Sequence, residues 1–296
     1  MSDFRGKTPA DAARVCRFTH EAMACTFGVA LLERDAVYAR QAADAAFAEV
    51  DRLEQELSRF IDTSDVARIN ALSPGETVVV GIDTLACLRL ADRLCRETRG
   101  AFDVAFRTPP GESGGPPLVV DPAARTVAVT RPGVRIDLGG IGKGYAVDQM
   151  AAMLRAWSIG AGLIHAGQSS VYALGYPPHA EAWTVPLRHP DAPDREIGRA
   201  ALRDRSLSGS GCRLHGHHII DPRGGEPVMG KRAAWAVARS AAVSDALATA
   251  AMVMTPDEIA AYCSGHGDVA LAYVTAETPP QAIVTGRGLC LDMSDG

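Results

Sequence analysis

Residues 134–148 read Val-Arg-Ile-Asp-Leu-Gly-Gly-Ile-Gly-Lys-Gly-Tyr-Ala-Val-Asp, with four glycines in the six positions 139–144. The pattern predicts an apolar strand over 134–138, a bend, and a helix that begins at Tyr145. A glycine-rich bend between a strand and a helix lets backbone N–H groups approach an anion, and the helix N-terminus favours negative charge. The stretch therefore predicts a site for a phosphate-bearing ligand.

Two familiar nucleotide-binding loops do not fit this stretch. A P-loop has the pattern Gly-x-x-x-x-Gly-Lys-Ser/Thr, but here Gly144 follows Lys143, and Asp137 stands in place of the first glycine. The dinucleotide pattern Gly-x-Gly-x-x-Gly, begun at Gly140, would require glycine at Tyr145. A phosphate ligand would thus be bound by a loop of another kind.

Composition limits the class of protein. The chain has 296 residues, is 47% hydrophobic and carries a net charge of −5, which fits one large domain or two close subdomains. A mildly acidic chain without a dense Lys/Arg run argues against nucleic-acid binding. No apolar stretch approaches the roughly 20 residues that span a bilayer, and the N-terminus has no apolar signal region. We expect a cytoplasmic protein whose seven scattered cysteines are free thiols.

Apolar spacing along the chain predicts a mixed architecture. A short helix is expected after Ser64 or Asp65, either of which could cap it. Because several predicted strands are consecutive, the pattern favours an α+β fold over a doubly wound parallel sheet. The longer predicted helices cover residues 36–58, 83–98, 145–157, 244–254 and 256–263, and strands are expected near 24–32, 78–80, 118–120, 126–130, 134–138, 162–175, 182–187, 196–203, 217–220, 234–239, 269–274 and 281–284.

Asp245 and Thr249 lie four residues apart in Ser-Asp-Ala-Leu-Ala-Thr (244–249). On a helix they share one face, so a carboxylate and a hydroxyl oxygen converge. Oxygen ligands of this kind suit Mg²⁺. The same residues also fit an ordinary first helical turn, in which Asp245 only complements the helix dipole. The hexapeptide alone leaves both interpretations open.

Residues 212–223 contain three of the eight histidines. Their spacing completes no zinc site, and in a strand His217 and His218 would face opposite sides. One of them could reach a cleft and act as a general base near neutral pH. An ordinary surface strand explains the same residues equally well.

Six segments, taken in order, resemble the sequence blocks of the FAD:protein FMN transferases, the ApbE-like flavin transferases. The resemblance runs from about Met23 to Met254. The central block, 136–148, matches nearly residue for residue, whereas Cys25 and Gln168-Ser169-Ser170 depart from the family pattern, and the 104–134 connector is short. The six segments are Met-Ala-Cys-Thr-Phe (23–27), LSRFIDTSDVARIN (57–70), GAFDV (100–104), IDLGGIGKGYAVD (136–148), HIIDPRGGEPV (218–228) and DALATA (245–250).

The resemblance implies a fold and a reaction. The fold would be α+β and T-fold-related, with mixed sheets, flanking helices and two close subdomains around an FAD cleft. A single domain would cover residues 21–290 after an N-terminal extension, 1–20. The family moves FMN from FAD to a Thr or Ser hydroxyl of an acceptor protein and releases AMP.

The resemblance also implies roles for individual residues. Lys143 and His218 would act at the reacting phosphate, with His218 as candidate base. Mg²⁺ would be held by the Gly140 carbonyl, Asp245 and Thr249. FAD would be bound by Met23, Phe60, Ala101, Phe102, Asp103, Asp137, Lys143 and Ile220.

Two other activities remain compatible with these residues. An FAD pyrophosphatase would use water as the acceptor and give FMN and AMP, with the same metal and phosphate contacts. A non-catalytic FAD-binding protein would not need the Asp245/Thr249 pair, because flavin binding alone requires no metal.

Overall fold

One antiparallel sheet of eight strands forms the centre of the protein. The computed structural model describes residues 14–108, 115–192, 194–211 and 219–291. Strand order in the sheet is β1-β2-β6-β7-β10-β11-β12-β13, and each neighbouring pair is antiparallel. The strands are β1 (Arg14–Ala22), β2 (Cys25–Glu33), β6 (Gly162–Ala166), β7 (Ser170–Leu174), β10 (Arg205–Gly211), β11 (Lys231–Ala238), β12 (Ala270–Thr275) and β13 (Ala282–Thr285).

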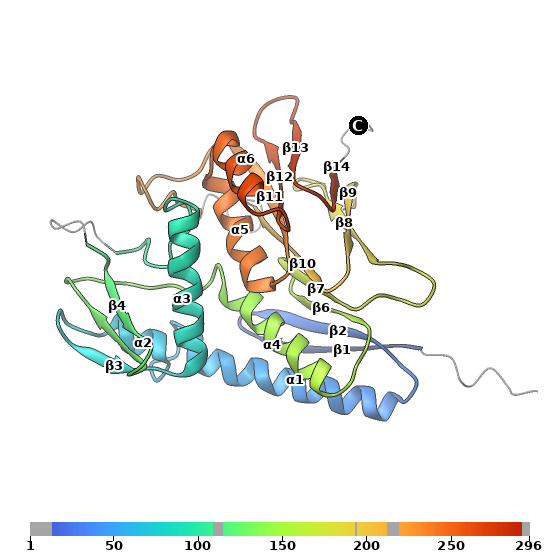
Figure 1. Ribbon diagram of the computed structural model, residues 1–296, viewed down its shortest axis with the longest axis horizontal. Coiled ribbons are helices and arrows are strands. Elements are labelled where there is room, and N and C mark those ends of the chain that lie inside the picture. The colour runs from blue at the N-terminus through green and yellow to red at the C-terminus, as the bar shows by residue number, and fades with distance from the viewer. Residues whose placement is uncertain (1–13, 109–114, 193, 212–218, 292–296) are drawn as a thin grey trace, which may run out of the picture.

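Three helices cover one face of this sheet (Figure 1). They are α1 (Ala36–Leu57), α4 (Gly142–Ala156) and α5 (Ala241–Val253). Their buried positions are rich in alanine, for example Ala39 and Ala43 in α1 and Ala246 and Ala250 in α5. Small side chains let the helix backbones lie close to the strands and to one another. The result is a dense core under the first turns of α4 and α5.

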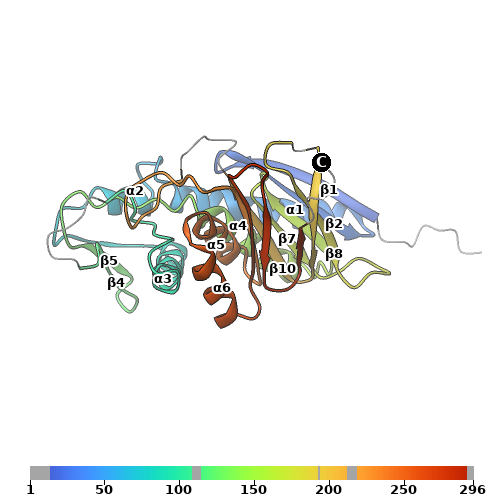
Figure 2. The same cartoon turned by 90° about the horizontal axis from the view of Figure 1, so that it is seen from above.

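A smaller sheet covers the opposite face. It has the order β14-β9-β8 and comprises β8 (Trp183–Arg188), β9 (Glu196–Leu202) and β14 (Leu289–Leu291). Figure 2 shows β8 and α5 on opposite sides of the large sheet. Leu187 and Ile197 pack with Val237 of β11 in a second apolar cluster.

A further group of elements lies beside the large sheet (Figure 1). It contains a sheet of order β3-β5-β4, with β3 (Thr77–Val79), β4 (Leu118–Asp121) and β5 (Thr126–Val129). Two helices belong to it, α2 (Asp65–Asn70) and α3 (Ile82–Glu97), and α6 (Pro256–Gly265) follows α5. This group contributes to the main apolar core through residues such as Val66 and Val127.

Helices α4 and α5 cap one another. Asp148, in the middle of α4, accepts hydrogen bonds from the backbone N–H groups of Ala241 and Ala242 at 2.7 and 3.0 Å. In return Asp245, in the second turn of α5, accepts a hydrogen bond from Gly144 N–H in the first turn of α4 at 3.0 Å. Each carboxylate thus meets unpaired N–H groups and the positive end of the other helix dipole.

The predicted α+β class is confirmed, with antiparallel sheets. The predicted helices are present within a few residues of their expected bounds, and Ser64 caps α2 through Ala67 N–H as one of the two expected caps. β1 begins at Arg14, earlier than the predicted domain boundary at residue 21. No helix among the described residues is both long and apolar enough to cross a membrane.

The strand predicted over 134–138 is wrong. The segment is extended but joins no sheet. Its backbone pairs instead with side chains and a loop: Ile136 N–H donates to the Asn70 amide oxygen at 2.7 Å, and Asp137 N–H donates to Val104 O at 2.8 Å. Two helices also begin earlier than predicted. α4 begins at Gly142 rather than Tyr145, and α5 begins at Ala241, where Asp148 satisfies its first N–H groups.

Candidate functional site

The glycine-rich turn 139–144 places backbone against backbone at the α4–α5 junction. Leu138 O accepts hydrogen bonds from the N–H groups of Ile141 and Gly142, so the turn leads directly into α4. A Cβ atom at Gly144 would lie 2.2 Å from Ala241 O. Such a distance is far inside van der Waals contact, so only glycine lets the two helix N-termini meet here.

Asp245 is a buried carboxylate beside this turn. The residue is 5% exposed, and its Oδ2 accepts the hydrogen bond from Gly144 N–H. Burial raises the pKa of Asp245, and the Lys143 ammonium and the hydrogen bonds from Gly144 and Ser170 oppose that rise. Ser170 itself accepts a hydrogen bond from Ser208 at 3.0 Å. The carboxylate is therefore oriented by hydrogen bonds from two sides.

Thr249 and Gly140 lie next to one another at the same junction. A Cβ atom on Gly140 would lie 3.6 Å from Thr249 Oγ1. The Thr249 hydroxyl donates to Asp245 O one helical turn earlier at 3.3 Å, which leaves its oxygen lone pairs free to accept. A carboxylate, a hydroxyl and a backbone carbonyl are hard oxygen donors that suit Mg²⁺.

These residues fit a magnesium ion that keeps part of its water shell. Within the described ranges no three His, Cys, Asp or Glu side chains gather into a cluster. An ion at this junction would therefore rely on one carboxylate together with hydroxyl and backbone oxygens. Mg²⁺ commonly binds through one or two carboxylates and takes its remaining ligands from waters and substrate phosphates.

Phe102 forms the wall behind the glycine turn. Its ring carbon Cε2 lies 3.2 Å from the position of a Cβ on Gly140, and the residue is 4% exposed. Its N–H donates to Thr98 Oγ1, and Ala101 beside it is buried. Asp103 accepts a hydrogen bond from Ala105 N–H at 2.8 Å, and burial raises the pKa of its carboxyl group. Ala101 and Phe102 thus act first as packing residues.

The β1–β2 hairpin brings Met23 and Cys25 to the same region. Met23 and Ala24 form its two-residue turn with φ of 48° and 57°. The left-handed region is strained for residues other than glycine, and such strain is common at functional sites. Burial is the main cause of the raised pKa of the Cys25 thiol. The charges of Lys143, which lowers this pKa, and of Asp245, which raises it, also act on the thiol.

Asp137 lies on the other side of the turn, among arginines. Its Oδ1 accepts a hydrogen bond from Gly139 N–H at 2.9 Å. Its Oδ2 lies 3.1 Å from Arg59 Nε and 3.5 Å from Arg107 Nε. The exposed ring of Phe60 lies under the Arg59 guanidinium at 4.1 Å. Lys143 Nζ donates to Gly139 O at 3.3 Å, so the lysine stays beside the turn.

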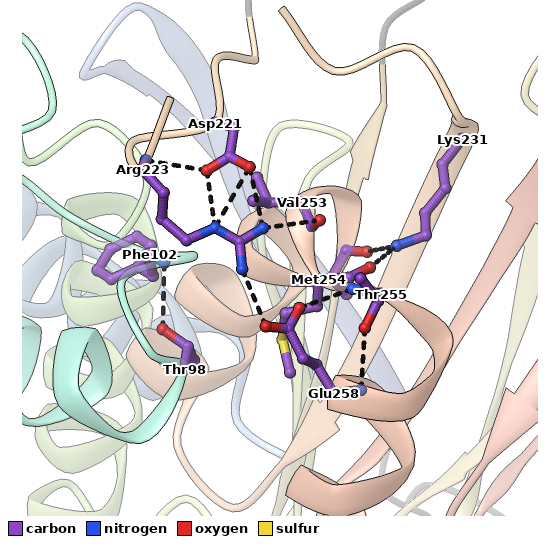
Figure 3. A network of polar contacts seen from close by, with 10 residues as sticks. Thr98, Phe102, Asp221, Arg223, Lys231, Val253, Met254, Thr255 and Glu258 are labelled. Carbon is purple, nitrogen blue, oxygen red and sulfur yellow. Dashed lines mark hydrogen bonds and ion pairs between the residues drawn. The ribbon is translucent and has the colours of Figure 1, made fainter. Parts of the chain in front are cut away.

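Arg223 joins its loop to α5 and α6 (Figure 3), and Ile220 lies three residues before it in the chain. Ile220 forms an isolated bridge with Pro227. Arg223 bonds Asp221 with Nε and Nη2, and its Nη1 donates to Glu258 of α6 at 2.9 Å. Its Nη2 also lies 3.4 Å from Val253 O at the end of α5. His218 and His217 lie outside the described residues.

The structure therefore brings together most of the predicted site. Gly140, Lys143, Asp245 and Thr249 meet at the α4–α5 junction, with Phe102 behind them. Asp137 and Phe60 lie on the arginine side of the turn.

Sequence reasoning missed Arg59, Arg107 and Asn70. Arg59 directly precedes the recognised Phe60, which is the one signal that could have drawn attention to it. Asn70 closes the LSRF…N block and holds the Ile136 backbone from both sides, as donor at 3.0 Å and acceptor at 2.7 Å.

The chain is similar to known proteins over most of its length. An FAD:protein FMN transferase of Klebsiella pneumoniae (strain 342) is 32% identical over 120 residues, which is 38% of this chain, and the match spans only 36% of that protein. The FAD:protein FMN transferase of Treponema pallidum is 26% identical over 267 residues, covering 75% of this chain and 74% of that one. The apo crystal structure of the Pseudomonas stutzeri flavinyl transferase ApbE superposes with a TM-score of 0.80 at 23% identity, over 93% and 95% of the two chains.

The ApbE family profile matches residues 23–109 and 115–273, which is most of the chain. The matched range includes the glycine turn, Asp245 and Thr249. The chain belongs to the ApbE family.

Proposed function

We propose that this protein is a Mg²⁺-dependent FAD:protein FMN transferase that moves FMN from FAD to a Thr or Ser hydroxyl of an acceptor protein and releases AMP. One observation carries the proposal. The buried Asp245 carboxylate, Thr249 Oγ1 and the Gly140 backbone meet beside Lys143 at a helix N-terminus. Flavin binding alone requires no metal, so it would not need a carboxylate, a hydroxyl and a backbone carbonyl together beside Lys143.

The residues of the chain would divide the work as follows. Lys143 would offset negative charge on the pyrophosphate, and the first N–H groups of α4 would add their dipole. Asp245, Thr249 and the Gly140 carbonyl would hold Mg²⁺, which when bound stabilises charge on the phosphate oxygens. Met23 in the β1–β2 turn, and Phe60 on the arginine side, would line the flavin or the adenylate of FAD. His218 is the candidate base for the acceptor hydroxyl.

The decisive experiment incubates the purified protein with FAD, Mg²⁺ and a panel of candidate acceptor proteins. Fluorescence of a covalent flavin on an acceptor band after denaturing electrophoresis, with AMP released in equal amount, is the expected result. AMP release without acceptor labelling would make the protein an FAD pyrophosphatase instead. Tight FAD binding without AMP release would leave a flavin-binding protein. We propose that the protein and its acceptor occur in the cytoplasm. Localising the tagged protein in cells tests this.

A further inference from the structure

An open cavity of about 670 Å³ lies between α2 and the extended segment 134–138. Three arginines line it, Arg59, Arg107 and Arg135, together with Ala67, Asn70, Ala71 and Ile136. The cavity adjoins Asp137, because both Arg59 and Arg107 contact that carboxylate. It therefore continues the candidate site from Asp137.

The charges in the cavity do not balance. Asp137 is the one ion-pair partner of Arg59 and Arg107 among the described residues, and each arginine reaches it through Nε alone. The side chains of Arg59 and Arg107 are 34% and 51% exposed. A guanidinium has five N–H donors, so the Nη groups of both residues remain available to a ligand. In a chain of net charge −5, a cavity lined by three arginines, two of them beside a single carboxylate, favours an anionic occupant.

Arg135 has a different part in the cavity. Its Nη1 donates to Asn70 O and to Val134 O, both at 2.8 Å. These bonds fix the guanidinium against the backbone, so it serves as a wall. Arg59 and Arg107 are the arginines left to contact a ligand.

We propose that Arg59 and Arg107 bind the adenylate half of FAD and so select FAD over flavins that lack it; this inference rests on the proposed function. Asp137 alone beside a pyrophosphate would repel it, since both are negative. The two arginines reverse that sign and present donors that match phosphate oxygens. The same contacts retain AMP after FMN has left. An acidic segment of the acceptor protein is the competing occupant.

The test uses Arg59→Gln, Arg107→Gln and the double variant, each removing one or two positive charges from the cavity. Arg68→Gln is the matched control, because Arg68 lies on α2 but pairs with Asp65 and does not line the cavity. Dissociation constants are measured for FAD, AMP and riboflavin by calorimetry at low and moderate salt. We expect each single variant to weaken FAD and AMP binding about tenfold, with riboflavin binding and the control unchanged.

Three results would overturn the inference: unchanged FAD and AMP affinity in the double variant, an equal loss for riboflavin, or a rise confined to the KM for the acceptor. Failure of the wild-type protein to bind FAD would instead count against the proposed function. Thermal unfolding of each variant checks the fold. Should the double variant not fold, Arg59→Lys and Arg107→Lys keep the charge and remove the planar fork, and weaker AMP binding is still expected.

Discussion

The two carboxylates on either side of the glycine turn have opposite surroundings. Asp245 is buried and accepts hydrogen bonds from a helix N–H group and from a hydroxyl, and burial raises its pKa. The Asp137 side chain is 17% exposed and forms ion pairs with Arg59 and Arg107 at the edge of an open cavity. A buried carboxylate with one nearby ammonium favours a small multivalent cation, whereas a carboxylate outnumbered by arginines lies in a region that favours an anion. Only seven positions separate Asp137 from Gly144, so one short turn joins the two environments.

Asp245→Asn should have the largest effect of the variants considered for the two carboxylates. The amide keeps the shape and can still meet the turn, but it removes the charge that would hold Mg²⁺. We expect FMN transfer to fall at least about 10³-fold while the folded state at neutral pH is no less stable, because a buried charge is gone. Flavin transfer to an acceptor protein and unfolding in urea measure these two effects, and electron paramagnetic resonance of bound Mn²⁺ measures the loss of the metal. Full activity in the variant would contradict the metal assignment.

Gly144→Ala and Gly142→Ala test whether the α4–α5 junction has room for a side chain. An alanine Cβ at 144 would lie 2.2 Å from Ala241 O, so we expect a loss of about 2–3 kcal/mol in the free energy of unfolding. At 142 the nearest atom is Leu138 Cβ at 3.9 Å, so alanine should be neutral or stabilise the first turn of α4 by about 0.5–1 kcal/mol. Urea denaturation of both variants compares them directly. Equal stability would mean that the helix junction tolerates side chains.

The pH dependence of stability should distinguish the buried carboxylate. Because burial raises the pKa of Asp245 in the folded state, its contribution is present below the unfolded pKa of about 4 and is lost as pH rises through the folded value. In EDTA, the stability of the wild type relative to Asp245→Asn should therefore fall as pH increases. Added Mg²⁺ should reverse that fall, since the metal binds the ionised form. Urea midpoints from pH 4 to pH 8 test this, and a flat difference would count against it.

Phe60→Ala should have the smallest effect on the fold. Phe60 is 77% exposed and contacts the Arg59 guanidinium. We expect its removal to change stability by less than about 0.5 kcal/mol and to weaken FAD binding about tenfold through lost stacking. Fluorescence titration with FAD and a thermal melt measure the two quantities. A large loss of stability would show that the cavity side also supports the core.

Local patterns predicted the elements whose cause is local. The apolar spacing of Phe47, Val50 and Leu53 predicted α1, and Ser64 is the cap that its residue type suggested. The segment 134–138 looks like a strand because its side chains alternate, yet its backbone partners are Asn70 and Val104. Sequence alternation reports burial and not the identity of the hydrogen-bond partner. α5 begins at Ala241 rather than at the predicted residue 244, because Ser240 caps it and Asp148 from another helix satisfies its first N–H groups.

In the candidate site, too, contacts between residues close in sequence were predictable and contacts between distant residues were not. Asp245 and Thr249 were visible as a pair four residues apart, but Gly140 lies 105 positions before Asp245 and only the family resemblance joined these two. The hydrogen bond from Gly144 N–H to Asp245 came from the structure alone. Arg59 and Arg107 have no spacing that connects them, and they meet because Asp137 lies between them in space.

The mutual capping of α4 and α5 has a consequence for how the protein opens. If either helix loses its first turn, the carboxylate that the other helix supplies loses its hydrogen-bond donors. Fraying of one helix therefore leaves an unpaired charge on the other. The amide hydrogens of Gly144 and Ala242 should then exchange with solvent at matching rates, as one cooperative unit. Most helix ends fray independently. The turn that carries the proposed metal ligands would open only when both helix ends unfold together, which is rarer. Its oxygens would therefore keep their relative positions for longer.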